Sequence, residues 1–93
     1  EAWLGKARVI YNKAFKMEQK ALEIKDYKLS DIAVAKAFEV YKESIPFFEK
    51  VIELDPEDFE TMKTLRSLFY KLTNSDPSYQ AKYDEINKKM SGY

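Results

Sequence analysis

Charged residues are the first candidates for chemistry in this 93-residue chain, because it contains no histidine and no cysteine. Their absence excludes the commonest general base, thiol nucleophiles, structural zinc sites and histidine-ligated metals. The densest charged feature is an acidic run comprising Glu49, Glu53, Asp55, Glu57, Asp58 and Glu60. Such carboxylates could bind calcium or perform acid–base catalysis. The run lacks the spacing of an EF-hand loop, and helix starts and an exposed helix face explain much of it, so we expect no metal, cofactor or catalytic residue.

Lysines near the start of the chain are the second candidate feature. Lys6, Lys13, Lys16 and Lys20 fall within roughly 80° of arc on a helix, at about 100° per residue. A basic stripe of this kind can bind nucleic acid. The chain as a whole, however, has 16 basic and 16 acidic residues. Lysine stems also commonly cover the edge of an apolar helix face, so we expect no nucleic-acid partner.

The elements that must position these residues are helices. Apolar residues in the first segment recur at alternating spacings of four and three, which is the period of one helix face. They are Trp3, Ala7, Ile10, Ala14, Met17, Ala21 and Ile24. We expect a connection over residues 26–31, with Ser30 capping the second helix. That helix contains Pro46, but its apolar stripe keeps its phase, so a kink is expected rather than a break.

Two further helices are predicted after acidic–proline pairs. The pairs Asp55-Pro56 and Asp76-Pro77 each combine a capping carboxylate with a proline suited to the first helical turn. Four helices joined by short connections favour antiparallel neighbours. The expected fold is therefore all-α, a single domain over residues 1–93 made of two stacked helical hairpins. The first hairpin, residues 1–56, has two unusually long helices, and the second covers residues 57–93.

Charge and apolar patterning add two expectations. The formal net charge is +3 over residues 1–28, −6 over residues 29–60 and +3 over residues 61–93. This alternation favours packing the acidic second helix between basic neighbours, and it leaves a polarised surface that could steer a partner. No uninterrupted apolar run approaches the length of a membrane-spanning helix, so no membrane insertion is expected.

The middle of the chain resembles the tetratricopeptide repeat (TPR) family. Residues with the spacing of the second helix of that repeat are Tyr41, Ser44, Phe48, Val51 and Pro56. Residues at the first-helix positions of the next repeat are Met62, Leu65, Arg66 and Phe69, of which Arg66 departs from the usual small residue. About 25 residues beyond the 34-residue period lengthen the first hairpin. The chain resembles the C-terminal repeats of a bacterial protein of this family, with an atypical last helix like that of a capping unit.

This resemblance implies a non-catalytic module that holds a peptide or partner protein on a concave helical surface. By position, the residues on that surface are Arg8, Tyr11, Asn12, Glu60, Lys63, Ser67, Tyr70 and Lys71. The alternative is a structural cap or self-associating unit, in which Trp3 and Leu4 pack against an upstream repeat or a second copy. Similar bacterial repeat proteins are often exported, which slightly favours the cell envelope over the cytoplasm.

Overall fold

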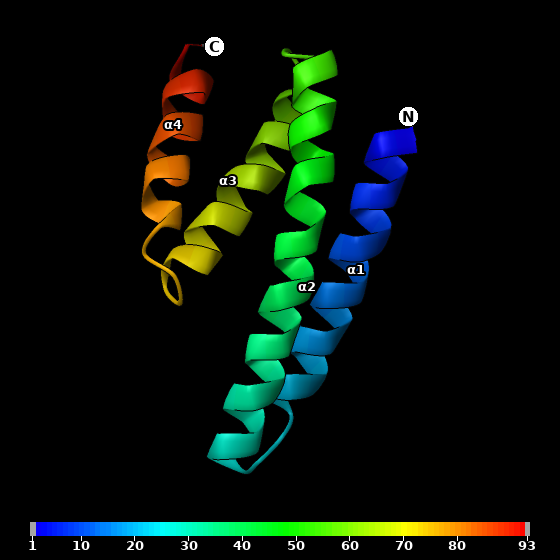
Figure 1. The fold of residues 1–93 in the computed structure, drawn as a ribbon, viewed down its shortest axis with the longest axis vertical. Coiled ribbons are helices and arrows are strands. Elements are labelled where there is room, and N and C mark those ends of the chain that lie inside the picture. The colour runs from blue at the N-terminus through cyan, green and yellow to red at the C-terminus, as the bar shows by residue number, and fades with distance from the viewer. Residues whose placement is uncertain (1, 93) are drawn as a thin grey trace. The chain divides into compact units, whose positions relative to one another are not determined.

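The computed structural model describes residues 2–92, which form four α-helices and no strand (Figure 1). The helices are α1 (Ala2–Leu22), α2 (Tyr27–Leu54), α3 (Phe59–Thr73) and α4 (Tyr79–Ser91). The predicted all-α class and the predicted number of helices are confirmed. The chain divides into two compact units, residues 1–48 and residues 49–93, so the boundary falls inside α2.

In the first unit, α1 and the first part of α2 form an antiparallel hairpin, seen as the blue-to-green pair in Figure 1. Near the open end, the ring centroids of Trp3 and Phe47 lie 5.9 Å apart. At the closed end, the hydroxyl of Ser30 donates a hydrogen bond of 2.8 Å to the backbone carbonyl of Ala21. These two contacts fix the register of the helices along most of the hairpin.

Small side chains form the line of contact between α1 and α2. The buried residues of α1 are Ala7, Ala14 and Ala21, spaced seven residues apart. On α2, Ala37 and Ser44 are buried at the same spacing. Small residues allow two helices to approach closely, as the bond from Ser30 to the α1 backbone requires. We call these buried small residues the alanine seam; they leave the larger apolar side chains of α1 on its flanks.

Tyr41 is the central residue of one flank of the seam. Its side chain is fully buried, and its hydroxyl donates a hydrogen bond of 2.8 Å to Oε1 of Glu18. The rings of Tyr11 and Phe38 meet the Tyr41 ring edge-on, at 5.4 Å and 6.1 Å between centroids. Burial, and after it the hydrogen bond to Glu18, raise the pKa of the Tyr41 phenol above its ordinary value. The phenol is therefore protonated at neutral pH.

The start of α2 differs from the prediction. The helix begins at Tyr27, inside the expected connection over residues 26–31. The carboxylate of Asp26 accepts a hydrogen bond of 3.1 Å from the backbone N–H of Leu29, so Asp26 caps the first turn. Ser30 is not the cap, because its hydroxyl bonds to the neighbouring helix instead.

The helix α2 continues through Pro46 as far as Leu54, so it neither ends nor restarts at the proline. Proline cannot donate a hydrogen bond to the preceding turn. Pro46 lies on an exposed side of α2, where water can satisfy the backbone carbonyl that loses this donor.

In the second unit, α3 and α4 form a shorter antiparallel hairpin with a core of large apolar side chains. Its buried residues include Met62, Leu65, Leu68, Phe69, Leu72, Ile86 and Met90. The ring of Phe69 on α3 stacks on that of Tyr79 on α4, with 6.1 Å between centroids. Contact between large residues thus holds this hairpin together.

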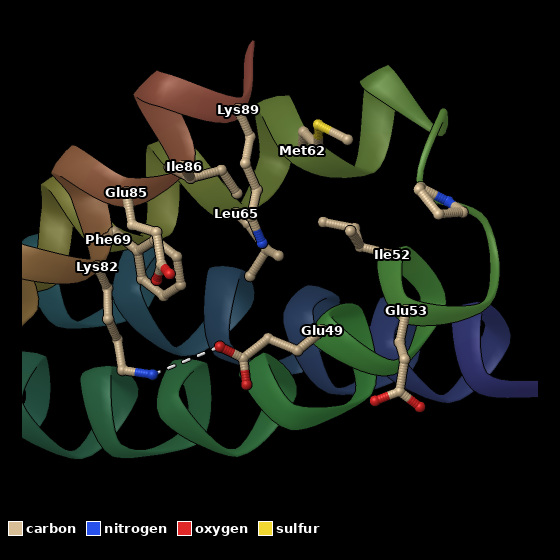
Figure 2. Close-up of a pocket in the computed structure, with 11 residues that line it drawn as sticks. Glu49, Ile52, Glu53, Met62, Leu65, Phe69, Lys82, Glu85, Ile86 and Lys89 are labelled. Atoms are coloured by element: carbon tan, nitrogen blue, oxygen red, sulfur yellow. Dashed lines mark hydrogen bonds and ion pairs between the residues drawn. The ribbon is translucent and has the colours of Figure 1, made fainter. Parts of the chain in front are cut away.

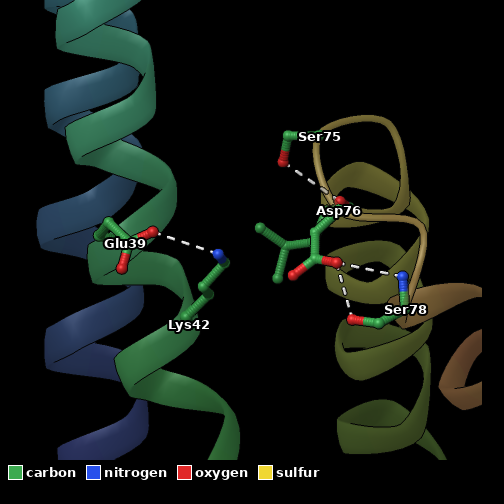
Figure 3. Close-up of polar contacts among 6 residues, drawn as sticks. Glu39, Lys42, Ser75, Asp76 and Ser78 are labelled. Carbon is green, nitrogen blue, oxygen red and sulfur yellow. Dashed lines mark hydrogen bonds and ion pairs between the residues drawn. The ribbon is translucent and has the colours of Figure 1, made fainter.

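Carboxylates organise both helix starts in this unit. Asp58, rather than the predicted Asp55, caps α3, accepting hydrogen bonds of 3.0 Å and 2.8 Å from the backbone N–H and hydroxyl of Thr61. Asp55 instead accepts from the backbone N–H of Glu57 and closes the turn after α2. Before α4, the Asp76 carboxylate accepts from the backbone N–H and hydroxyl of Ser78, at 3.1 Å and 2.7 Å (Figure 3).

Candidate functional site

The second unit carries a surface hollow of about 480 Å³ between α3, the loop that follows it, and α4. We call it the tyrosine hollow. Its lining residues are Arg66, Ser67, Tyr70, Lys71, Asn74 and Tyr83. Four of these residues, from Arg66 to Lys71, belong to α3. They form two adjacent pairs about one helical turn apart, so they lie together on one side of the helix.

The chemistry of the tyrosine hollow is cationic and amphipathic. The ring centroids of Tyr70 and Tyr83 lie 5.7 Å apart, and 62% of Tyr70 is exposed. Arg66 and Lys71 supply positive charge, and among residues 2–92 the lining contains no carboxylate. Ser67 and Asn74 add hydrogen-bonding groups. The hollow therefore combines exposed aromatic surface with two cations and two neutral polar side chains.

Three of the five α3 residues predicted for the partner-binding surface lie together in this hollow: Ser67, Tyr70 and Lys71. The other two, Glu60 and Lys63, are exposed on the same helix but do not line it. Their side chains approach each other at 3.8 Å, and the Lys63 ammonium lies 5.7 Å from the centroid of the Phe59 ring.

The three predicted residues of α1 belong to the first unit. Arg8 and Asn12 are exposed. Tyr11 is only partly exposed, because its ring packs edge-on against Tyr41 and Phe48, at 5.4 Å and 6.1 Å between centroids. Much of the Tyr11 side chain is therefore used in holding its own hairpin.

Sequence reasoning missed three lining residues of the hollow. Tyr83 shares a helical spacing of four, three and four with Tyr79, Ile86 and Met90, which indicates a core position, and Asn74 lies in a polar stretch between two helices, which indicates a connection. Arg66 offered a signal, since a large cation stands where the resembling repeat has a small residue.

A second recess in the same unit is an apolar cleft of about 600 Å³ (Figure 2). Its apolar lining consists of Ile52, Pro56, Met62, Leu65, Phe69 and Ile86. Charged residues of both signs complete the lining: Glu49, Glu53, Lys82, Glu85 and Lys89. The ammonium of Lys82 lies 3.4 Å from a carboxylate oxygen of Glu49. Unlike the tyrosine hollow, this cleft has no predominant charge.

The acidic run from Glu49 to Glu60 has structural partners in the same unit. Glu49 pairs with Lys82, and Glu53 accepts a hydrogen bond of 2.8 Å from Lys50. Asp55 and Asp58 bond to backbone N–H groups at the turn and the helix start. Within residues 2–92, no three histidine, cysteine, aspartate or glutamate side chains gather closely enough to hold a metal ion.

Comparison with protein-family models, curated proteins and solved structures finds no match to this chain. The resemblance to tetratricopeptide repeats therefore stays a prediction, which depends on the residues between Tyr41 and Phe69. Across the described helices, none combines the length and the apolar character needed to span a membrane.

Proposed function

We propose that the chain is a non-catalytic interaction module that holds a peptide or partner protein in the tyrosine hollow. The observation that supports this proposal is the composition of the hollow: two tyrosine rings and two cations on one surface. Tyrosine and arginine are the residue types that most often dominate binding energy at protein interfaces. The resemblance to tetratricopeptide repeats, which use first-helix residues for binding, points to the same side chains of α3.

The chemistry of the hollow favours a partner segment that carries a carboxylate next to an aromatic or aliphatic side chain. Arg66 and Lys71 can form charge-assisted hydrogen bonds with the carboxylate. The exposed ring of Tyr70 offers apolar area together with a hydroxyl group. The net charge of +3 over residues 61–93 would speed the approach of an acidic partner.

Selection of binders from a random peptide library tests this proposal. We expect the intact chain to enrich acidic peptides that contain an aromatic or aliphatic residue. Tyr70→Ala should weaken their binding by about tenfold or more, which corresponds to about 1.4 kcal/mol. The matched control is Tyr27→Ala, since Tyr27 is also an exposed helical tyrosine but lies in the first unit.

Charge provides the second arm of the experiment. Lys71→Glu should weaken the same peptides, and added salt should weaken their binding to the intact chain. Two outcomes would contradict the proposal. One is equal binding of the selected peptides to the intact chain, to Tyr70→Ala and to Tyr27→Ala. The other is a selection in which no acidic peptide is enriched.

A further inference from the structure

An incompletely covered apolar surface runs along the first hairpin, on the flank of the alanine seam opposite Tyr41. We call it the tryptophan face. It consists of Trp3, Ile10 and Met17 on α1 and Val40 and Phe47 on α2. None of these five side chains is buried, and 39% of Trp3 is exposed even though it contacts Phe47. On the opposite flank, by contrast, Tyr41 and Phe48 are buried.

The residues of the tryptophan face and of the alanine seam together have the spacing of core positions in a helix bundle. On α1, the seam residue Ala14 lies four residues after Ile10 and three before Met17, which is the alternation of core positions in a seven-residue repeat. On α2, Val40 and Phe47 alternate in the same way with Ala37 and Ser44. The hairpin buries the small members of both repeats but leaves the large members accessible to solvent. Helices with this pattern bury both sets of positions when they pack in a four-helix bundle.

We infer that two copies of this chain associate through their tryptophan faces and form an antiparallel four-helix bundle. The available area is sufficient. The 21 residues of α1 extend about 31 Å, and two adjacent helices are about 20 Å wide. The side of the hairpin that carries the tryptophan face therefore covers about 600 Å², and a dimer packed along its whole length would bury about 1,200 Å² in total, which is at the lower limit of stable interfaces.

Charge selects one of the two symmetric arrangements. The outer edge of α1 carries Lys6, Lys13 and Lys20, spaced seven residues apart and all exposed. A twofold axis across the helices would place this row against its own copy, with like charges opposed. A twofold axis along the helices instead places it against α2 of the other copy, whose outer edge carries charges of both signs: the exposed carboxylates of Glu39 and Glu43 and the exposed ammonium group of Lys36. The second arrangement is therefore favoured, because an edge of mixed charge opposes fewer like charges to the lysine row than a second copy of that row does.

Sedimentation equilibrium of the intact 93-residue chain, from low micromolar to millimolar concentration, tests the inference. We expect the average mass to rise from that of one chain to that of two, and not beyond. Met17→Glu places a charge at the centre of the tryptophan face and should weaken association by more than about tenfold. The matched control is Leu22→Glu, because Leu22 is an exposed apolar residue on the other flank of α1. Far-UV circular dichroism verifies that both variants keep their helices.

A charge exchange between exposed residues tests the arrangement without disturbing the core. In the favoured dimer, the register that pairs Trp3 with Phe47 brings Lys6 of one copy to the level of Glu43 of the other. Lys6→Glu alone and Glu43→Lys alone should each weaken self-association, because each creates like-charge contacts on both edges of the interface. An equimolar mixture of the two variants should restore dimers.

Three results would overturn the inference. A single-chain mass at every concentration would exclude the second copy as the occupant of this face. A dimer that Met17→Glu leaves unchanged would place the interface elsewhere, and a mixture no stronger than the separate variants would reject the proposed arrangement. Peptide binding in the tyrosine hollow is a separate property, since Tyr70→Ala should leave the mass unchanged.

Discussion

The two hairpins of this chain are held together in opposite ways. In the first, small residues such as Ala14 and Ala37 form the contact between helices, and large apolar side chains remain partly exposed on one flank. In the second, large residues such as Leu65 and Phe69 are buried, and the exposed surface presents tyrosines and cations. A helix pair closed by small side chains keeps its large ones available for another protein chain. A pair closed by large side chains leaves mainly aromatic rings and charged groups exposed for contact with a partner.

The largest effect should come from removing volume in the second hairpin. Phe69 is 3% exposed, stacks on Tyr79 and lies beneath the Lys82 ammonium. Phe69→Ala should lower the free energy of unfolding by about 3–5 kcal/mol, because it removes apolar contacts and leaves a cavity. Urea denaturation measures this loss. Leu54→Ala is the control, because 64% of Leu54 is exposed; an equal loss for both variants would contradict the contrast between the hairpins.

The first hairpin should instead be sensitive to added volume. Ala14 is fully buried in the alanine seam, so Ala14→Leu must push α1 and α2 apart. We expect the free energy of unfolding to fall by about 1–3 kcal/mol. The control is Ala35→Leu on α2, where the side chain is exposed and the change should be close to neutral. A stability of Ala14→Leu at or above that of the original chain would show that the seam tolerates larger residues.

The hydrogen bond between Tyr41 and Glu18 should contribute the next largest effect. Tyr41→Phe removes the donor and leaves the partly buried Glu18 carboxylate without this bond. The expected loss is about 1.5 kcal/mol, since the acceptor is charged. Thermal unfolding at neutral pH measures it, and the double variant Tyr41→Phe, Glu18→Gln should lose less than the two single losses added together.

This bond also predicts a dependence on alkaline pH. Folding raises the pKa of Tyr41 above its ordinary value of 10.0. The stabilisation is therefore fully present below about pH 10 and is lost as the pH rises above it. The difference in stability between the original chain and Tyr41→Phe should narrow above pH 10. A difference that stays constant through this range would contradict the assignment.

The smallest of these effects belongs to the start of α3. Asp58 accepts hydrogen bonds from the backbone and the hydroxyl of Thr61. Asp58→Ala should cost about 1 kcal/mol of unfolding free energy, and Asp58→Asn should recover most of it, since asparagine also caps helices. Asp55→Ala tests the specificity of the cap. A greater loss at Asp55 than at Asp58 would restore Asp55 as the capping residue predicted from the sequence.

The sequence was sufficient to predict the number of helices and their apolar faces, because helical periodicity depends on residues close together in the chain. It was insufficient at the helix starts. Choosing between Asp26 and Ser30 required the contact of Ser30 with Ala21, nine residues earlier and on another helix. The same limit applies to the site. The resemblance to tetratricopeptide repeats predicted Ser67, Tyr70 and Lys71 by position, but Tyr83 comes from a different helix and joins them only after the hairpin has formed.

The alanine seam has a consequence for how α1 can change during evolution. At most positions of a soluble helix, replacing alanine with a larger aliphatic residue is an ordinary substitution, but at Ala7, Ala14 and Ala21 it removes the space that α2 occupies. Saturation mutagenesis of α1 should therefore show a period of seven residues in tolerance to substitution, with the lowest tolerance at the smallest side chains. Homologues of this chain would be recognised more reliably by the positions of α1 that keep small residues than by the positions that keep hydrophobic ones.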